Sequence, residues 1–264
     1  MPRRIVDLSV ALESGIASDP PGNEPKITYI AHKDPAALSR MLPHFPGLTA
    51  DELPGGEAWA VEQLAVSTHN GTHLDAPYHF HSTMDGGKRA WTIDEVPLEW
   101  CMGRGVKLDF RHLPDGYVAT PGDVETELKR AAVTLQPFDI VLVNTAAGAR
   151  YGEPDYVSRG CGMGRAATLW LTERGIKITG TDAWSWDAPF VHTAKKYAAS
   201  GDASLIWEGH RAGIERAYCH IEKLANLEGL PATGYTVCCF PFKIKRASAG
   251  FTRVVAIFED AGAA

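Results

Sequence analysis

Short runs rich in β-branched and aliphatic residues constrain the fold of this 264-residue chain more than any other feature. They cover residues 5–10, 106–110, 140–144, 176–181, 235–240 and 253–258, and turn-forming residues flank them, as is typical of β-strands. Helical patterns at residues 121–135 and 164–174 lie between some of these runs. Because strands and helices mix without strict alternation, the sequence predicts an α/β fold in which helices flank a mixed sheet.

The two helical patterns carry recognisable end signals. Thr120 precedes Pro121 as a candidate N-cap, and Arg174-Gly175 is a common C-terminal signal. Residues 146–162 are rich in glycine and polar residues and are predicted to form a loop. Residues 20–54 are predicted to be irregular, with a short helix at 35–41. Because we find no repeat and no linker composition, we expect a single domain spanning residues 1–264.

The composition is that of an ordinary globular protein, with 45% hydrophobic and 22% charged residues. The net charge is −6 and lysine and arginine form no stripe, which argues against nucleic-acid binding. No stretch approaches the roughly 18–20 apolar residues of a membrane helix, so we expect no membrane partner. The opening residues lack the apolar core of a secretory signal, and the five cysteines have no framework spacing. We therefore expect a cytoplasmic protein.

The densest chemistry lies in residues 67–81, STHNGTHLDAPYHFH, which hold four of the ten histidines. Asn70-Gly71 and Ala76-Pro77 disfavour a helix here, so we expect a turn followed by a short extended piece. His73 and Asp75 then point the same way, because side chains alternate along a strand. His69 comes back across the turn to meet them. Two imidazoles and one carboxylate on one side form a site suited to Zn²⁺, Mn²⁺ or Fe²⁺, with positions open for water.

This segment also resembles a known signature. The run from His69 to His79, HNGTHLDAPYH, closely resembles the H-x-G-T-H-x-D-x-P-x-H motif of the cyclase-type metal-dependent hydrolases. That family includes bacterial kynurenine formamidase and isatin hydrolase. Further matches are Asp7-Leu8-Ser9, Gly180-Thr181-Asp182 with Ser185, His210 followed by Glu222 before Asn226-Leu227, and Pro241 with Lys243.

The resemblance implies a role for each matching residue. His69, His73 and Asp75 match ligands of a first metal ion, and Asp75 can bridge to a second ion held by His210 and Glu222. His79 matches the proposed acid/base. The cofactor implied is one or two divalent ions, Zn²⁺ or Mn²⁺. The implied fold is a swivelling β/β/α domain, usually assembled as a homodimer or homotetramer.

The sequence departs from the family pattern in the regions expected to face the substrate. A long segment, residues 23–57, follows Pro20-Pro21-Gly22 and has no counterpart that we can align. The loop at residues 159–164, RGCGMG, is also distinctive, and its role is left open. Trp184 and Trp186 could form a shared aromatic wall, although tryptophans are more often core residues. His192 and His220 are interpreted as structural or surface residues.

These features favour hydrolysis of a small amide, formamide or cyclic imide or lactam bond. A metal ion would activate water, and His79 would transfer the proton, with Glu222 as the alternative base. One rival reading is a lyase, cyclase or dehydratase that uses the same ligands to stabilise an enolate. A second rival is a non-catalytic metal-binding protein. The sequence does not separate these readings, and it leaves the exact substrate open.

Overall fold

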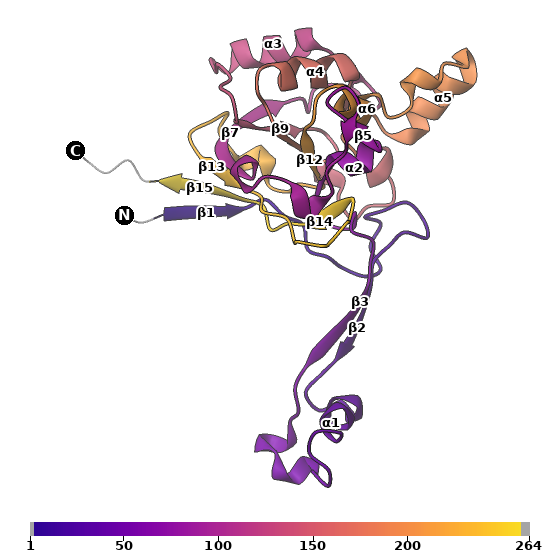
Figure 1. Ribbon diagram of the computed structural model, residues 1–264, viewed down its shortest axis with the longest axis vertical. Helices are drawn as coiled ribbons and strands as arrows, with labels where there is room; N and C mark the ends of the chain where they lie inside the picture. Colours follow the sequence, from indigo (N-terminus) through magenta and orange to yellow (C-terminus); the bar gives the residue numbers. More distant parts are fainter. Residues whose placement is uncertain (1–2, 260–264) are drawn as a thin grey trace, which may run out of the picture.

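A nine-stranded mixed sheet forms the centre of the computed structural model, which describes residues 3–259 (Figure 1). The strand order is β1-β15-β13-β7-β9-β11-β12-β4-β14. The four central strands β7, β9, β11 and β12 run parallel, and the strands on either side of them pair antiparallel. The predicted α/β fold, with a mixed sheet and flanking helices, is confirmed.

The strands of this sheet are mostly short. They are β1 (Arg3–Asp7), β4 (His73–Asp75), β7 (Met102–Asp109), β9 (Ile140–Asn144), β11 (Ile178–Thr181), β12 (Cys219–Glu222), β13 (Thr236–Cys238), β14 (Ala249–Phe251) and β15 (Val255–Glu259). Three two-stranded ladders lie outside it. They pair β2 (Lys26–Ile30) with β3 (Val61–Ala65), β5 (Thr83–Met84) with β6 (Lys88–Arg89), and β8 (Val118–Ala119) with β10 (Gly162–Met163).

The central strand β9 shows why the sheet is buried on both faces. All five of its residues are buried, as expected for a parallel strand that is covered on two sides. Val141 and Val143 pack with apolar residues of α3 (Pro121–Arg130) and α4 (Arg165–Glu173). Ile140 and Leu142 belong instead to a second core formed largely by residues of the curled sheet and its loops. The alternation of side chains along the strand therefore links the two cores.

The helices lie mainly on one side of the sheet. Besides α3 and α4 they are α1 (Pro35–Met41), α2 (Pro77–Phe80), α5 (Phe190–Ser200) and α6 (Glu208–Glu215). Helix α4 packs against both α3 and α6, and α6 packs against α2 (Figure 1). None of the helices in residues 3–259 is both long and apolar enough to cross a lipid bilayer.

The predicted elements agree with the structure except at some ends. Helix α1 occupies the predicted residues 35–41, whereas the helix predicted at 121–135 already ends at Arg130. Ala132 has a φ of 53°, a left-handed conformation that cannot continue a right-handed helix. The first predicted strand, residues 5–10, lies instead at Arg3–Asp7, where it pairs with β15.

The prediction that residues 20–54 are irregular is wrong in one respect. Strand β2 pairs along its full length with β3 in an antiparallel hairpin that projects from the body of the molecule (Figure 1). The tip of this hairpin carries α1. A small apolar cluster there includes Ile30, Ala37, Met41 and Ala58. We call residues 26–65 the arm.

Candidate metal centre

Two neighbouring strands carry most of the polar side chains of the candidate site. In the antiparallel pair of β4 and β12, His220 lies opposite Asp75 and Glu222 lies opposite His73. Alternation places His73 and Asp75 on one face of β4, and His220 and Glu222 on one face of β12. The register of this strand pair therefore gathers two imidazoles and two carboxylates on the same face. All four residues are buried.

The two oxygens of Asp75 face different groups of imidazoles. Oδ1 lies 2.9 Å from Nδ1 of His69 and 3.4 Å from Nε2 of His73. Oδ2 lies 3.1 Å from Nε2 of His220 and 4.0 Å from Nε2 of His79. Each carboxylate oxygen of Asp75 therefore faces its own pair of imidazoles.

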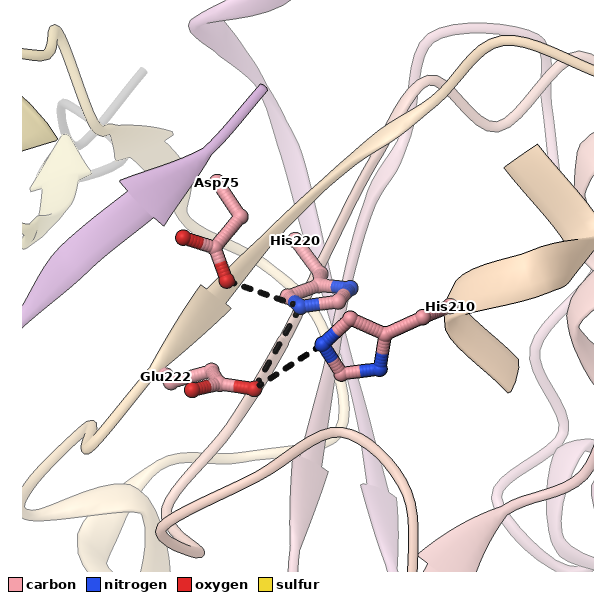
Figure 2. Close-up of side chains that lie close together, drawn as sticks. All are labelled: Asp75, His210, His220 and Glu222. Atoms are coloured by element: carbon pink, nitrogen blue, oxygen red, sulfur yellow. Dashed lines mark ion pairs between the residues drawn. The ribbon is translucent and has the colours of Figure 1, made fainter. Parts of the chain in front are cut away.

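Glu222 connects the same groups from the other side. Its Oε2 lies 3.6 Å from Nε2 of His73. Its Oε1 lies 3.3 Å from Nε2 of His220 and 3.8 Å from Nε2 of His210 (Figure 2). The backbone N–H of Trp186 donates to Oε1 at 2.9 Å and holds the carboxylate in place. Two sets of residues result, and within each set the ligand atoms lie within 4.8 Å of one another. The first set is His69, His73 and Asp75. The second set is Asp75, His210, His220 and Glu222.

Helix α6 brings His210 into the second set. Asp187 accepts hydrogen bonds from the backbone N–H groups of Gly209 at 2.7 Å and His210 at 3.0 Å, two groups that a first helical turn leaves unpaired. The same carboxylate contacts Nδ1 of the His210 ring. Asp187 therefore fixes both the start of the helix and the direction of the imidazole, and Nε2 of His210 faces Glu222.

The carboxylates and imidazoles of the cluster are electrostatically coupled. Burial opposes ionisation of Asp75, but the imidazoles of His79, His73 and His69 hold its pKa well below the usual range. Burial likewise opposes ionisation of Glu222, whereas the neighbouring His220 lowers its pKa to about 2. Two ionised carboxylates thus share a site with little access to solvent, and such charges must be paired or bind a metal.

The unpaired polar atoms test whether a metal ion fits these residues. Nε2 of His73, Nε2 of His220 and both carboxylate oxygens of Asp75 are buried and have no aligned hydrogen-bond partner among the described residues. Leaving such groups unsatisfied costs free energy. Imidazole nitrogens and carboxylate oxygens are the ligands that Zn²⁺ and Mn²⁺ accept. The donor set therefore fits a divalent transition metal.

His79 lies beside the cluster on a short helix. Pro77 is the first residue of α2, so no helix runs through it from Asp75, as expected. The expectation that the segment stays extended beyond this point was wrong, because proline is tolerated in the first turn of a helix, where its missing N–H has no intrahelical partner. The His79 ring lies 4.1 Å from the His69 ring, centroid to centroid. Burial lowers the pKa of His79 to about 4, so its imidazole is neutral at neutral pH.

A cavity of about 160 Å³ opens above the cluster. Its lining residues are Asp19, Pro20, Asn23, Ser67, His69, Asn70, His79, Trp184, Ser185, Trp207, His210 and Glu222. Trp184 lines this cavity, whereas Trp186 is buried in the core and donates its indole N–H to Thr168. The two tryptophans therefore do not form a shared aromatic wall: Trp186 lies in the core, where tryptophans are more often found, and Trp184 alone of the two lines the cavity.

Trp207 forms another wall of the cavity in a strained conformation. It has a φ of 54°, which is rare for a bulky residue, and it immediately precedes α6. Its ring stacks on His210 at 4.9 Å between centroids, and its buried indole N–H has no partner among the described residues.

The structure brings His69, His73, Asp75, His79, His210 and Glu222 together, as the sequence analysis expected. It also adds His220, and the interpretation of this residue as merely structural or on the surface missed its place in the cluster. The alternation of His220 and Glu222 along a short apolar run was the signal that could have found it. His192 instead contacts the backbone carbonyl of Ser158.

The loop at residues 159–164 packs onto the fold instead of joining the donor set. Arg159 pairs with Asp115 and Asp155, and Gly162 pairs in register with Val118. A Cβ at Gly162 would lie 1.8 Å from the backbone nitrogen of Ala188, so only glycine fits this close approach.

Known proteins are similar to this chain in sequence and in fold. The family model Cyclase, described as "Putative cyclase", matches residues 6–188. Cyclase-like protein 3 of Arabidopsis thaliana is 24% identical over 242 residues, which cover 89% of this chain and 80% of that protein. The solved structure of isatin hydrolase A from Labrenzia aggregata, bound to benzyl benzoate, is 25% identical with a TM-score of 0.70, covering 97% of this chain and 94% of that one.

A second solved structure, an isatin hydrolase bound to the product analogue thioisatinate, shares the fold with a TM-score of 0.75 at 18% identity. The likeness covers 98% of this chain and 93% of that chain. Because the family match at residues 6–188 spans well over half of the sequence, this chain belongs to the Cyclase family.

Proposed function

We propose that this chain is a metal-dependent hydrolase that cleaves a small amide, formamide or cyclic imide or lactam bond. One observation carries the proposal: the two oxygens of the buried Asp75 face two groups of imidazoles, and one imidazole of each group, His69 and His79, lines the cavity. The fold likeness to isatin hydrolases, one of them holding a product analogue, supports a cyclic amide as the substrate class.

His69, His73 and Asp75 would hold one divalent ion, and Asp75, His210 and Glu222 would hold a second. Zn²⁺ and Mn²⁺ are the candidates that this mixed set of nitrogen and oxygen donors suits. When bound, such an ion supplies Lewis acidity, which lowers the pKa of a water molecule and polarises a carbonyl oxygen.

His79 would transfer the proton in this reaction. A water oxygen attacks the carbonyl carbon, and His79 takes the proton from that water and passes it to the nitrogen as the carbon–nitrogen bond breaks. A neutral imidazole is the form that can accept a proton, and the nearby carboxylate of Asp75 favours the imidazolium that forms. Its Nε2 lies 4.0 Å from Asp75, close enough to serve water at the donor atoms.

The cavity would select a small substrate. Its volume of about 160 Å³ suits a single ring or acyl group, and Trp184 and Trp207 supply aromatic surface. The indole N–H of Trp207, which has no partner among the described residues, could donate a hydrogen bond to a carbonyl oxygen of the substrate.

The test is turnover together with metal dependence. Purified protein is assayed against aryl formamides, cyclic imides and isatin-type lactams, with its metal content measured by elemental analysis. We expect a chelator to abolish hydrolysis and Zn²⁺ or Mn²⁺ to restore it. Full activity in protein shown to be metal-free would contradict the proposal.

Labelled water separates hydrolysis from the rival reactions on the same ligands. Hydrolysis in ¹⁸O-water places one solvent oxygen in the product carboxylate, whereas a dehydratase or cyclase leaves no such label. Saturable metal binding without turnover on any substrate of the panel would favour a non-catalytic metal-binding protein instead.

We also propose that the chain forms a homodimer or homotetramer through the arm. A hairpin of two strands is at best marginally stable in water. The arm nevertheless exposes large apolar side chains, among them Tyr29 and Trp59, each 65% exposed, and Phe45 and Leu64, each 52% exposed. Contact with a second copy would bury this surface.

A further inference from the structure

His220 is held in one orientation by its neighbours. Its ring is fully buried between Phe80, stacked at 4.8 Å between centroids, and Trp186, stacked at 5.9 Å. On the far edge of the ring, Nδ1 lies 3.3 Å from the hydroxyl oxygen of Tyr218. The ring therefore presents Nε2 to the cluster, where this atom has no aligned hydrogen-bond partner within residues 3–259.

The spacing of the surrounding donors matches that of a metal polyhedron. A tetrahedral Zn²⁺ site with bonds of roughly 2.0–2.1 Å places neighbouring donors about 3.3 Å apart. Nε2 of His220 lies 3.1 Å from Oδ2 of Asp75 and 3.3 Å from Oε1 of Glu222 (Figure 2). Oε1 of Glu222 lies 3.8 Å from Nε2 of His210. These separations need only small adjustments to close around one ion.

We propose that His220 is the fourth protein ligand of the second metal site, together with Asp75, His210 and Glu222, and that this site is closed. The set of His69, His73 and Asp75 has three donors and keeps a position open. Structural zinc sites are typically four-coordinate through protein ligands alone, whereas catalytic sites retain a position for water or substrate. This inference rests on the metal binding of the proposed function. It assigns a structural role to the ion in the closed site and a catalytic role to the ion in the open site.

The positions of the four ligands support a structural role for that ion. Asp75 comes from β4, His220 and Glu222 come from β12, and His210 comes from α6. An ion bound to all of them would connect β4 to α6 and β12, which lie more than 130 residues further along the chain. The open site, next to His79, would then carry the chemistry.

Cobalt substitution tests the proposal in the wild-type protein. Metal-free protein is titrated with Co²⁺, and stoichiometry and visible absorption are recorded. We expect two ions per chain, one of them in a site of four protein ligands that gives an intense visible band and that azide does not reach. Azide should alter the spectrum of the open site and leave that intense band unchanged. A single ion per chain at saturation, or an azide-sensitive band at both sites, would overturn the proposal.

Substitution then assigns the band to His220. In His220→Leu we expect the intense band to disappear and the affinity of one ion to fall by roughly 100-fold or more. Losing a group that only hydrogen-bonds to a ligand already costs about 10–100-fold, and loss of a ligand itself should cost at least as much. His220→Gln, which keeps a polar group, is the second variant in case the first does not fold. His192→Leu is the matched control and should keep both ions. Unchanged affinity and spectrum in a folded His220 variant would overturn the assignment.

The metal readout keeps this inference separate from the proposed function. Two ions with the expected spectrum but no turnover would contradict the hydrolase proposal and leave the closed site standing. A single ion per chain together with metal-dependent hydrolysis would contradict the closed site and leave the hydrolase proposal standing.

Discussion

Asp187 holds His210 by two routes at once, because its carboxylate contacts Nδ1 of the imidazole and accepts the backbone N–H of the same residue at 3.0 Å. A proton on Nδ1 leaves the lone pair of Nε2 free to face Glu222, 3.8 Å away. A carboxylate behind a metal-ligating histidine fixes the tautomer in this way. Asp187 is thus a positioning residue of the candidate centre.

Replacing Asp187 tests this positioning. In Asp187→Asn the amide N–H₂ can face Nδ1, which favours a proton on Nε2 and removes the free lone pair. We expect metal affinity at the second site to fall about 10–100-fold, measured by competition with a chromogenic chelator. Asp155→Asn, which alters a partly buried carboxylate paired with Arg150 and Arg159 outside the cluster, is the control. Equal affinities in the two variants would refute the positioning role.

His79 and His73 are expected to respond differently to removal. His79→Ala should keep its metal content and lose about 10²–10⁴-fold in kcat, the usual contribution of general acid–base catalysis. His73→Ala should lose metal and activity together, since it removes a donor atom. Elemental analysis beside kcat for both variants makes the comparison. If His79→Ala loses metal as readily as His73→Ala, His79 is a ligand. If its kcat stays near normal, Glu222 becomes the leading candidate for the base.

Asp182 should make stability depend on pH. Burial raises the pKa of this carboxyl to about 7, although Thr145 and Asn144 donate hydrogen bonds to it. Between its ordinary pKa near 4 and pH 7, the folded chain therefore holds a proton that the unfolded chain has released. The stabilisation is full below about pH 4 and is lost as the pH rises towards 7.

The variant Asp182→Asn cannot titrate and should lack this contribution. Relative to wild type, its free energy of unfolding should therefore rise by about 1–4 kcal/mol between pH 4 and pH 7. Urea unfolding over a pH series measures the difference, with Asp51→Asn, at an exposed carboxylate, as the control. A difference between Asp182→Asn and wild type that is constant with pH would contradict the expected titration.

The arm should control self-association. Light scattering coupled to gel filtration is expected to show a dimer or tetramer for wild type. The double variant Trp59→Ser, Leu64→Ser should shift it towards the monomer, because apolar burial contributes about 25 cal/mol per Å². Phe138→Ser, which removes an apolar side chain that is 50% exposed outside the arm, is the control. A monomeric wild type would dispose of the idea.

The sequence by itself determined the local features of this protein. His69, His73, Asp75 and His79 lie within eleven residues, and a glycine turn and a proline leave few ways to arrange them, so their grouping could be predicted. Helix α1 was predicted at its observed bounds because Pro35 and the residues that follow set it locally. The buried run of β9 likewise specified a central strand.

Only the tertiary structure decided the contacts between distant segments. His220 enters the cluster because β12 pairs with β4 in a register that sets it opposite Asp75, and a shift of one residue would turn its ring to the other face. The same dependence on distant partners placed Trp184 at the cavity and Trp186 in the core, and set Asp187 behind His210. Residue types and spacing limit what one turn or strand can present, whereas sheet register and helix packing determine which of those side chains meet.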